Sequence, residues 1–330
     1  MRLPAEEASE FLTHGKVIAV PTETVYGLAA LATNPQAIAK VFEIKNRPAD
    51  NPLICHFYSL EQIEKFAASI SGNTRFLIKH FSPGPISYLI DLPSESPLFF
   101  ATCGRKQMIA RIPDHPVFLT ILKKINVPLA APSANTSGRV SPTSIEMVEK
   151  DLGNNIDGSV DGGYSKIGLE STIIDARSVN QIIILRPGAI GETEIQTILP
   201  DVSIQRVTSA NSAEATPGSR YTHYAPKTPI YWLPEEHRLV SNAIILHTDE
   251  QLKDFKSEQG KYFSKNNIHL VSLGSVNNLP ELAQHFYERL SSIDLLQLPI
   301  AFMLKVNWGN SSLSKAIENR MDKIIQHSEF

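Results

Sequence analysis

Short apolar runs alternate with segments of helical periodicity along most of this chain, and that alternation limits its fold more than any other feature. The runs are rich in Val, Ile and Leu, whereas the other segments place apolar residues three or four positions apart. The strand-like runs are residues 17–20, 52–57, 86–92, 108–112, 129–131, 171–175 and 181–185. The helical segments are residues 35–45, 60–81 with a break near 71–72, 117–125 and 144–150. This pattern is typical of a layered α/β domain.

A change in composition divides the chain into two parts. Residues 207–229 are rich in Thr, Ser, Ala, Pro and Gly and have little apolar periodicity, as interdomain linkers often do. After them come strand-like runs at 243–246, 269–273 and 300–304, a helical pattern at 282–290 and an amphipathic helix at 312–325. The sequence therefore predicts a domain of residues 1–206, a linker of residues 207–229 and a smaller, largely parallel α/β domain of residues 230–330.

The composition excludes several classes of protein. Lys and Arg number 31 against 34 Asp and Glu, a formal net charge of -3, which argues against a wide RNA-binding surface. Cys55 and Cys103 have no CxxC pair or histidine cluster nearby, so we expect neither a disulfide framework nor a metal site. The first residues lack the pattern of a secretory signal, and no run reaches the roughly 18 apolar residues that span a bilayer. We expect a soluble, cytoplasmic protein.

Five polar segments follow or border the strand-like runs and together offer a site for an anionic ligand. They place hydroxyl, amide or cationic groups at the ends of strands, where open α/β sheets bind ligands. The sequence contains no GxxxxGK[ST], GxGxxG, HExxH or GxSxG motif, so a nucleotide would need a cradle of another kind. The segments are PTETVYG at 21–27, KNRPADNPLICH at 45–56, ARIPDHP at 110–116, APSANTSGRVSPT at 131–143 and GLESTIIDA at 168–176.

In their order these segments resemble the YrdC-like threonylcarbamoyl-AMP synthases in their longer, two-domain form. The family's KxR element is present as KNR at 45–47 and its SxN element as SAN at 133–135. Further matches are PTETVYGL, RPxxNPL, the PGP at 83–85, RIPDHP, the ESTI at 170–173 and the RPG at 186–188. The resemblance covers nearly the whole chain. It implies a twisted, open mixed sheet with flanking helices at 1–206 and a Rossmann-like α/β domain at 230–330.

The resemblance implies an enzyme that joins L-threonine, bicarbonate and ATP into threonylcarbamoyl-AMP and releases pyrophosphate. The product would pass to a transferase that modifies tRNA next to the anticodon, and stable direct binding of tRNA by this chain is not expected. Mg²⁺ would enter with ATP, because this ion keeps several waters and needs few protein ligands. No other organic cofactor and no metal site built by the protein are implied.

The resemblance also implies roles for individual residues. Arginine contacts to carboxylates and phosphates fix orientation as well as charge, so catalysis would come from positioning and electrostatics without a protein nucleophile. The residues expected around L-threonine are Thr24, His56, Arg111, Ala131 and Ser171. Those expected around ATP are Arg47, Asn51, Gln107, Ser133, Ser141, Arg186 and Tyr224. The residues assigned to catalysis are Lys45, Arg47, Ser133 and Asn135.

Two other functions fit parts of the pattern. One is an RNA-binding module with salt-sensitive affinity and no ATP turnover. The other is a carbamoyl-adenylate-forming enzyme with another acceptor. Taken singly, the residues also have structural explanations: His56 could pack within a strand, Thr24 could cap a turn, and Arg186 could be a solvated charge. Only the joint pattern favours the synthase.

The linker segment TPGSRYTHYAPKTP, residues 216–229, is expected to close over the site. Its aromatic and basic residues suit a triphosphate, and its prolines restrict the backbone. The family's usual form is close to SPGMKYRHYAP, and here Ser219, Arg220 and Thr222 replace Met, Lys and Arg. After Pro229 the sequence shows no catalytic constellation.

Overall fold

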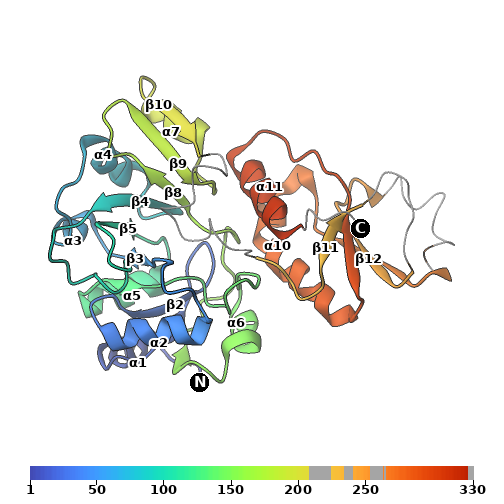
Figure 1. Ribbon diagram of the computed structural model, residues 1–330, viewed down its shortest axis with the longest axis horizontal. Coiled ribbons are helices and arrows are strands. Elements are labelled where there is room, and N and C mark those ends of the chain that lie inside the picture. The colour runs from blue at the N-terminus through green and yellow to red at the C-terminus, as the bar shows by residue number, and fades with distance from the viewer. Residues whose placement is uncertain (208–223, 234–240, 253–262, 264, 326–330) are drawn as a thin grey trace.

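The chain forms two α/β units that lie side by side, each built on its own β-sheet (Figure 1). The computed structural model describes residues 1–207, 224–233, 241–252, 263 and 265–325. Most of the predicted linker, including Ser219, Arg220 and Thr222, lies outside the described residues. Within the described part of the chain, no helix has the length and apolar character needed to cross a membrane.

The first unit contains a mixed sheet with the strand order β10-β9-β8-β4-β5-β3-β6-β2-β1-β7. Its strands are β1 Ile18–Val20, β2 Gly27–Leu31, β3 Ile54–His56, β4 Ile86–Asp91, β5 Gln107–Arg111, β6 Leu129–Ala130, β7 Gly158–Ser159, β8 Thr172–Asp175, β9 Gln181–Arg186 and β10 Ser203–Arg206. Parallel neighbours, such as β3 with β5 and β4 with β8, occur beside antiparallel ones, such as β4 with β5. The predicted mixed α/β architecture is confirmed.

Inner strands of this sheet, including β1 beside the edge strand β7, are buried on both faces. In β1, Ala19 belongs to one apolar core with Tyr88, whereas Ile18 and Val20 belong to another with Phe118. Successive side chains of a strand point to opposite faces of the sheet. Burial on both faces explains why these strands appear in the sequence as continuous apolar runs.

The helices of the first unit are α1 Ala5–Thr13, α2 Pro35–Lys45, α3 Leu60–Glu64, α4 Gly72–Phe81, α5 Pro116–Ile125, α6 Ile145–Leu152 and α7 Glu192–Ile198. Asn34 caps α2 by accepting hydrogen bonds from two backbone N–H groups of the first turn, each at 3.1 Å. The helix ends at Lys45, and Asn46 then adopts a left-handed conformation with φ of 49°. This turn brings Arg47 out of the helix toward the sheet edge that carries the site.

The second unit is a sheet with the order β11-β14-β12-β13, in which all neighbouring strands are parallel. Its strands are β11 Ile230–Trp232, β12 Ala243–His247, β13 Ile268–Ser272 and β14 Ile300–Met303. Its described helices are η1 Val276–Asn278, α10 Leu279–Ser292, η2 Ile293–Leu296 and α11 Ser312–Ile324. In Figure 1, α10 and α11 lie on the side of this sheet that faces the first unit. Buried Ile317, Met321 and Ile324 form an apolar face of α11, as the predicted amphipathic helix requires.

Several elements were not predicted, among them α1, α7, β2, β7, β10 and β11. The most important is β2, because the chain turns back after PTETVY and Gly27–Leu31 pairs with β1 in antiparallel register. The run GLAAL lacks the β-branched residues that mark strands, so its pairing became visible only in the structure. The polar segment at 21–27 is therefore a turn between two adjacent strands.

Candidate active site

A polar pocket lies where the predicted polar segments of the first unit meet Tyr224. All five segments singled out in the sequence contribute to its walls, because the ends of their strands gather at one edge of the sheet. The lining residues are Thr22, Thr24, Val25, Tyr26, Gly27, Arg47, Ile54, His56, Arg111, Ala131, Pro132, Ser133, Glu170, Ser171, Arg186 and Tyr224.

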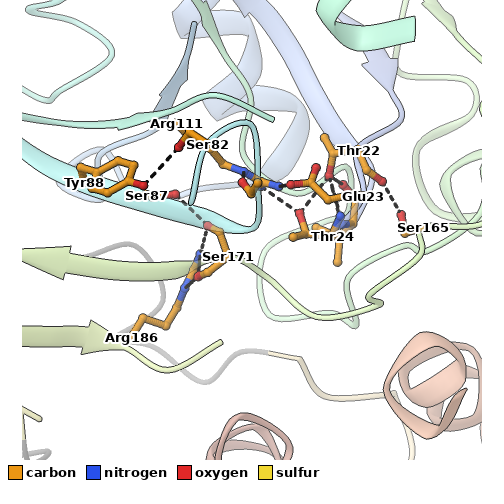
Figure 2. A network of polar contacts seen from close by, with 12 residues as sticks. Thr22, Glu23, Thr24, Ser82, Ser87, Tyr88, Arg111, Ser165, Ser171 and Arg186 are labelled. Atoms are coloured by element: carbon orange, nitrogen blue, oxygen red, sulfur yellow. Dashed lines mark hydrogen bonds and ion pairs between the residues drawn. The ribbon is translucent and has the colours of Figure 1, made fainter. Parts of the chain in front are cut away.

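The five residues expected around L-threonine, namely Thr24, His56, Arg111, Ala131 and Ser171, all line this pocket. Arg111 is only 4% exposed, and its Nη1 donates a hydrogen bond to Thr24 Oγ1 at 2.8 Å. Its Nη2 lies 2.6 Å from Glu23 Oε1 (Figure 2). These contacts fix the guanidinium in the turn between β1 and β2, and we call this part of the pocket the threonine end.

The sequence of the β1–β2 turn explains how these groups are presented. Thr22 Oγ1 accepts hydrogen bonds from the backbone N–H groups of Thr24 and Val25 at 3.1 and 3.2 Å, which closes the turn locally. Ser165 Oγ donates to the Thr22 carbonyl at 2.9 Å and ties the turn to a distant segment (Figure 2). Arg111 Nε also donates to the carbonyl of Gly84, within the PGP element, at 3.3 Å.

Two other guanidinium groups of the pocket have neutral partners. Arg47 donates to the carbonyls of Asn51 and Pro52 and to the Asn51 side-chain oxygen at 2.8 to 2.9 Å. Arg186 is 6% exposed and donates to the carbonyl and hydroxyl of Ser171 at 2.8 to 3.0 Å (Figure 2). Burial lowers the pKa of Arg47 to about 10, so it stays protonated near neutral pH. Neutral hydrogen-bond partners do not cancel the charges of Arg47 and Arg186, although Glu170 also attracts Arg186. This part of the pocket, the nucleotide end, therefore favours an anion.

Lys45, one of the residues expected to act in catalysis, does not line the pocket. It is 1% exposed, and its Nζ donates to the carbonyls of Ser133 and Asn135 at 2.5 Å each. Burial, together with the charge of Arg47, lowers the pKa of Lys45 well below its ordinary value. In this structure Lys45 holds the SAN turn at 133–135 in place.

Four further expected residues also lie outside the pocket wall. Asn51 contacts Arg47, and Ser141 Oγ donates to Glu170 Oε1 at 2.6 Å, so both of them touch pocket residues. Asn135 lines a separate cavity beside α6, and Gln107 lines another, where its Nε2 donates to Asp91 Oδ1 at 3.2 Å. The structure thus brings Arg47, Ser133, Arg186 and Tyr224 together but not Gln107 or Asn135.

His56 both packs within the core, as a structural strand residue would, and lines the pocket, as a threonine-site residue would. Its ring centroid lies 5.4 Å from that of Phe118 in the core, and the residue also lines the pocket. Burial, assisted by the charge of Arg111, lowers the pKa of His56 to about 3. The imidazole is therefore neutral near physiological pH and does not act there as a proton donor in its charged form.

Glu170 lines the pocket, and no role for it follows from the sequence. Its Oε2 lies 2.9 Å from Arg320 Nε, and its two carboxylate oxygens accept hydrogen bonds from Tyr287. Burial raises the pKa of Glu170, but the charges of Arg320 and Arg186 outweigh this and hold it below its usual value. Tyr287 and Arg320 belong to α10 and α11, so the second unit contacts a residue of the pocket wall. In the sequence, an arginine within a helical pattern is indistinguishable from a solvated charge.

Comparisons with known proteins agree with this geometry. A family model described as "Telomere recombination" matches residues 10–188, and one described as "Threonylcarbamoyl-AMP synthase, C-terminal domain" matches residues 190–323. The threonylcarbamoyl-AMP synthase of Bacillus subtilis is 32% identical over 96% of this chain and 91% of its own length. The threonylcarbamoyl-AMP synthase of Pyrococcus abyssi is 33% identical over 96% of this chain and 92% of its own length.

Solved structures give the same result. The crystal structure of P. abyssi Sua5 complexed with L-threonine superposes with a TM-score of 0.81 at 30% identity, over 98% of this chain and 96% of that one. A doubly substituted form of the same P. abyssi protein gives a TM-score of 0.79 at 29% identity, over 99% of this chain and 95% of that one. Because the likeness in sequence and in fold extends through both units, the chain belongs to the family of threonylcarbamoyl-AMP synthases.

Proposed function

We propose that the pocket binds L-threonine at its threonine end and ATP at its nucleotide end, and joins them with bicarbonate into threonylcarbamoyl-AMP. The observation that carries this proposal is the pair of guanidinium groups, Arg47 and Arg186, whose partners are neutral. They lie in the same pocket as all five residues expected around threonine. The solved complex of P. abyssi Sua5 with L-threonine supports the amino-acid substrate.

In the proposed reaction, the threonine amine forms a bond to carbon and loses a proton to give a carbamate. With bicarbonate a water molecule leaves, and with carbon dioxide one C=O π bond opens. A carbamate oxygen then attacks the α-phosphorus of ATP, and the bond to the bridging oxygen of pyrophosphate breaks. Since every reactant is anionic, the main tasks of the protein are to align the reactants and to offset their charges. Arg47 and Arg186 would stabilise the charge that moves onto pyrophosphate, and no protein nucleophile is needed.

Expected residues outside the pocket wall would act through residues within it. Lys45 binds the carbonyls at both ends of the SAN turn, which presents Ser133 to the pocket. Asn51 accepts from Arg47 and so orients its guanidinium. Gln107, Ser141 and Asn135 stay proposed members of the site.

The linker is proposed to complete the nucleotide end. Tyr224 is 5% exposed and lines the pocket, and the backbone N–H of Ala225 donates to the carbonyl of Gly138 at 3.0 Å. A segment held in this way would exclude water from an adenylate that hydrolyses readily. We propose the same division as the sequence indicated, with a catalytic domain at 1–206, a linker at 207–229 and a small domain at 230–330. The end of β10 and the start of β11 support these limits.

Magnesium is proposed to enter on the phosphate oxygens of ATP. Among the residues that the structure describes, no group of three or more His, Cys, Asp or Glu side chains could hold a metal ion. Glu170, which lines the pocket, is engaged by Arg320, and Glu23, next to the pocket residue Thr24, is engaged by Arg111. This donor set does not fit a resident Mg²⁺ site, whereas an ion that keeps its waters and phosphate ligands needs none.

The product, a mixed anhydride, is proposed to pass to a tRNA threonylcarbamoyl transferase in the cytoplasm. The net charge of -3 supports a hand-off without stable binding of tRNA by this chain.

Pyrophosphate release with and without L-threonine and bicarbonate tests the proposed function. Release should require both, and Arg47→Ala should lower kcat/KM for ATP by at least about 30-fold, because losing a buried charge-assisted contact costs about 2 to 5 kcal/mol. Arg75→Ala removes an arginine that pairs with Glu64 at the surface, and this control should keep the parent's rate. Release that is independent of threonine, or full activity in Arg47→Ala, would contradict the proposal. An RNA-binding module would show no turnover at all.

A further inference from the structure

A buried polar cluster joins the two units beside the pocket. It contains Glu170 of the first unit with Tyr287 and Arg320 of the second, and both residues of the second unit are 0% exposed. Arg320 Nε lies 2.9 Å from Glu170 Oε2, and the Tyr287 hydroxyl lies 3.1 and 3.0 Å from the two carboxylate oxygens. Because Glu170 lines the pocket, α10 and α11 support one of its walls from outside.

The same helices also support Tyr224. The rings of Tyr224 and Tyr287 are stacked, with centroids 5.7 Å apart and an interplanar angle of 28°. Arg320 Cζ lies 5.3 Å from the centroid of the Tyr224 ring, within the range of a cation–π contact. Two pocket residues, one charged and one aromatic, are thus held by the same pair of side chains.

Arg320 lies among buried residues of α11 that are mostly apolar, although half-buried Lys323 also carries a charge close to Arg320 and Glu170. Its neighbours on α11, Ile317 and Met321, are completely buried, and a guanidinium in such surroundings is costly unless it is paired. The two units already have an apolar contact, since Val25 and Leu169 of the first unit belong to the same core cluster as residues of α10 and α11. Arg320 also takes part in this docking, since its Nη1 donates to the carbonyl of Pro187 at 3.0 Å, but a neutral carbonyl alone would not require a charged partner.

The negative charge of Glu170 explains the buried arginine better. A carboxylate without a partner in this wall would repel the triphosphate and would attract the guanidinium of Arg186, which the nucleotide end needs. Glu170 instead has its oxygens occupied by Arg320, by Tyr287 and by Ser141 Oγ.

We infer that Arg320 and Tyr287 are positioning residues for ATP binding. They neutralise and immobilise Glu170, so that Arg186 keeps its charge for the phosphates and Tyr224 keeps its ring against the pocket. Neither residue touches substrate, and both act through pocket residues. The inference rests on the proposed function, and it assigns the second unit a part in the nucleotide end.

Pyrophosphate release by the full chain, with KM for ATP, KM for threonine and kcat determined separately, tests the inference. Arg320→Met should raise KM for ATP at least about tenfold, because it leaves a buried carboxylate unpaired, and should change KM for threonine far less. Tyr287→Phe keeps the ring but removes its hydrogen bonds to the carboxylate, so the rise should be smaller, about three- to tenfold. The double variant Arg320→Met/Glu170→Gln should regain most of the lost ATP affinity, because the unpaired charge is gone.

Lys315→Ala is the matched control. Lys315 Nζ lies 3.5 Å from Glu192 and also joins the two units, but neither residue lines the pocket. This variant should keep the parent's KM for ATP, since exposed ion pairs contribute little.

Several results would overturn the inference. One is a KM for ATP in Tyr287→Phe and Arg320→Met that stays within about twofold of the parent's. Another is an equal rise in KM for ATP and in KM for threonine. A third is a double variant whose KM for ATP is as high as that of Arg320→Met. If Arg320→Met does not fold, Tyr287→Phe and the double variant decide the question. A parent chain that releases no pyrophosphate would refute the proposed function itself, whereas an active parent with unaffected variants would refute only this inference.

Discussion

Two buried arginine–glutamate pairs adjoin the same pocket, and they differ in what holds them together. Arg111 and Glu23 both belong to the first unit, where the end of β5 meets the turn between β1 and β2, and their closest atoms are 2.6 Å apart. Arg320 and Glu170 belong to different units, are separated by 150 positions in the sequence and lie 2.9 Å apart. The first pair is fixed by pairing within one sheet, whereas the second depends on the docking of α11.

This difference indicates how the pocket is built. The hydrogen bond and ion pair that join Arg111 to Thr24 and Glu23 lie within the first unit, although Val25 of the same turn packs against the second unit. The nucleotide end includes Glu170 and Tyr224, whose positions depend on α10 and α11. Substitutions in the first pair should therefore affect folding and threonine, and those at the junction of the units should affect ATP.

The largest effect is expected from breaking the pair within the first unit. Arg111→Met leaves Glu23 buried without its charge partner, so the free energy of unfolding should fall by about 3 to 5 kcal/mol, and threonine binding should be lost. Urea denaturation followed by circular dichroism measures the stability. Arg177→Met is the control: Arg177 pairs with Asp91 and Asp175, but its side chain is 34% exposed, and the loss should stay below about 1 kcal/mol. Equal losses in the two variants would contradict the comparison.

A somewhat smaller loss of stability is expected when the pH is lowered, and it arises from His56 at the threonine end. The folded protein keeps His56 neutral down to about pH 3, whereas the unfolded chain protonates it near 6.5. The unfolded state therefore binds more protons between these values, so stability is lost as the pH falls below 6.5. The loss from this residue should reach roughly 3 kcal/mol by about pH 4.

Unfolding free energies of the parent and of His56→Gln, measured across this pH range, provide the test. The variant should lose less stability on acidification than the parent, although it starts from a lower value. His80→Gln, at an exposed position of α4, is the control and should follow the parent. The prediction fails if the curves of the parent and His56→Gln stay parallel.

The smallest effect is expected from a glycine at the junction of the units. Gly168 has φ of +79°, and a Cβ there would lie 2.1 Å from the Ala283 carbonyl oxygen in α10. Gly168→Ala should therefore displace α10, lower the free energy of unfolding by about 2 kcal/mol and raise KM for ATP more than KM for threonine. Gly163→Ala separates backbone strain from the contact, because Gly163 has φ of +75° and nothing within 4 Å of the added Cβ. If both variants have the same KM for ATP, contact with α10 does not control the nucleotide end.

Much of the site could be predicted from the sequence because its residues follow apolar runs. Thr24 follows β1, and Ala131 and Ser133 follow β6, so strand periodicity alone places them at one sheet edge. The resemblance to a family then supplied the roles of His56 and Arg111, which by themselves look like ordinary strand residues. Where a side chain points was harder to predict, since the KxR element does not reveal that Lys45 binds the carbonyls of the SAN turn.

The sequence by itself determined the two α/β units, the gathering of polar segments at the strand ends and the family to which the chain belongs. These properties are local, because periodicity, capping residues and short motifs are all read within one segment. Only the tertiary structure decided that β2 pairs with β1, that Gln107 faces another cavity and that Arg320 meets Glu170. Such contacts join residues far apart in the chain, and their energies depend on burial and charge, which no single segment contains.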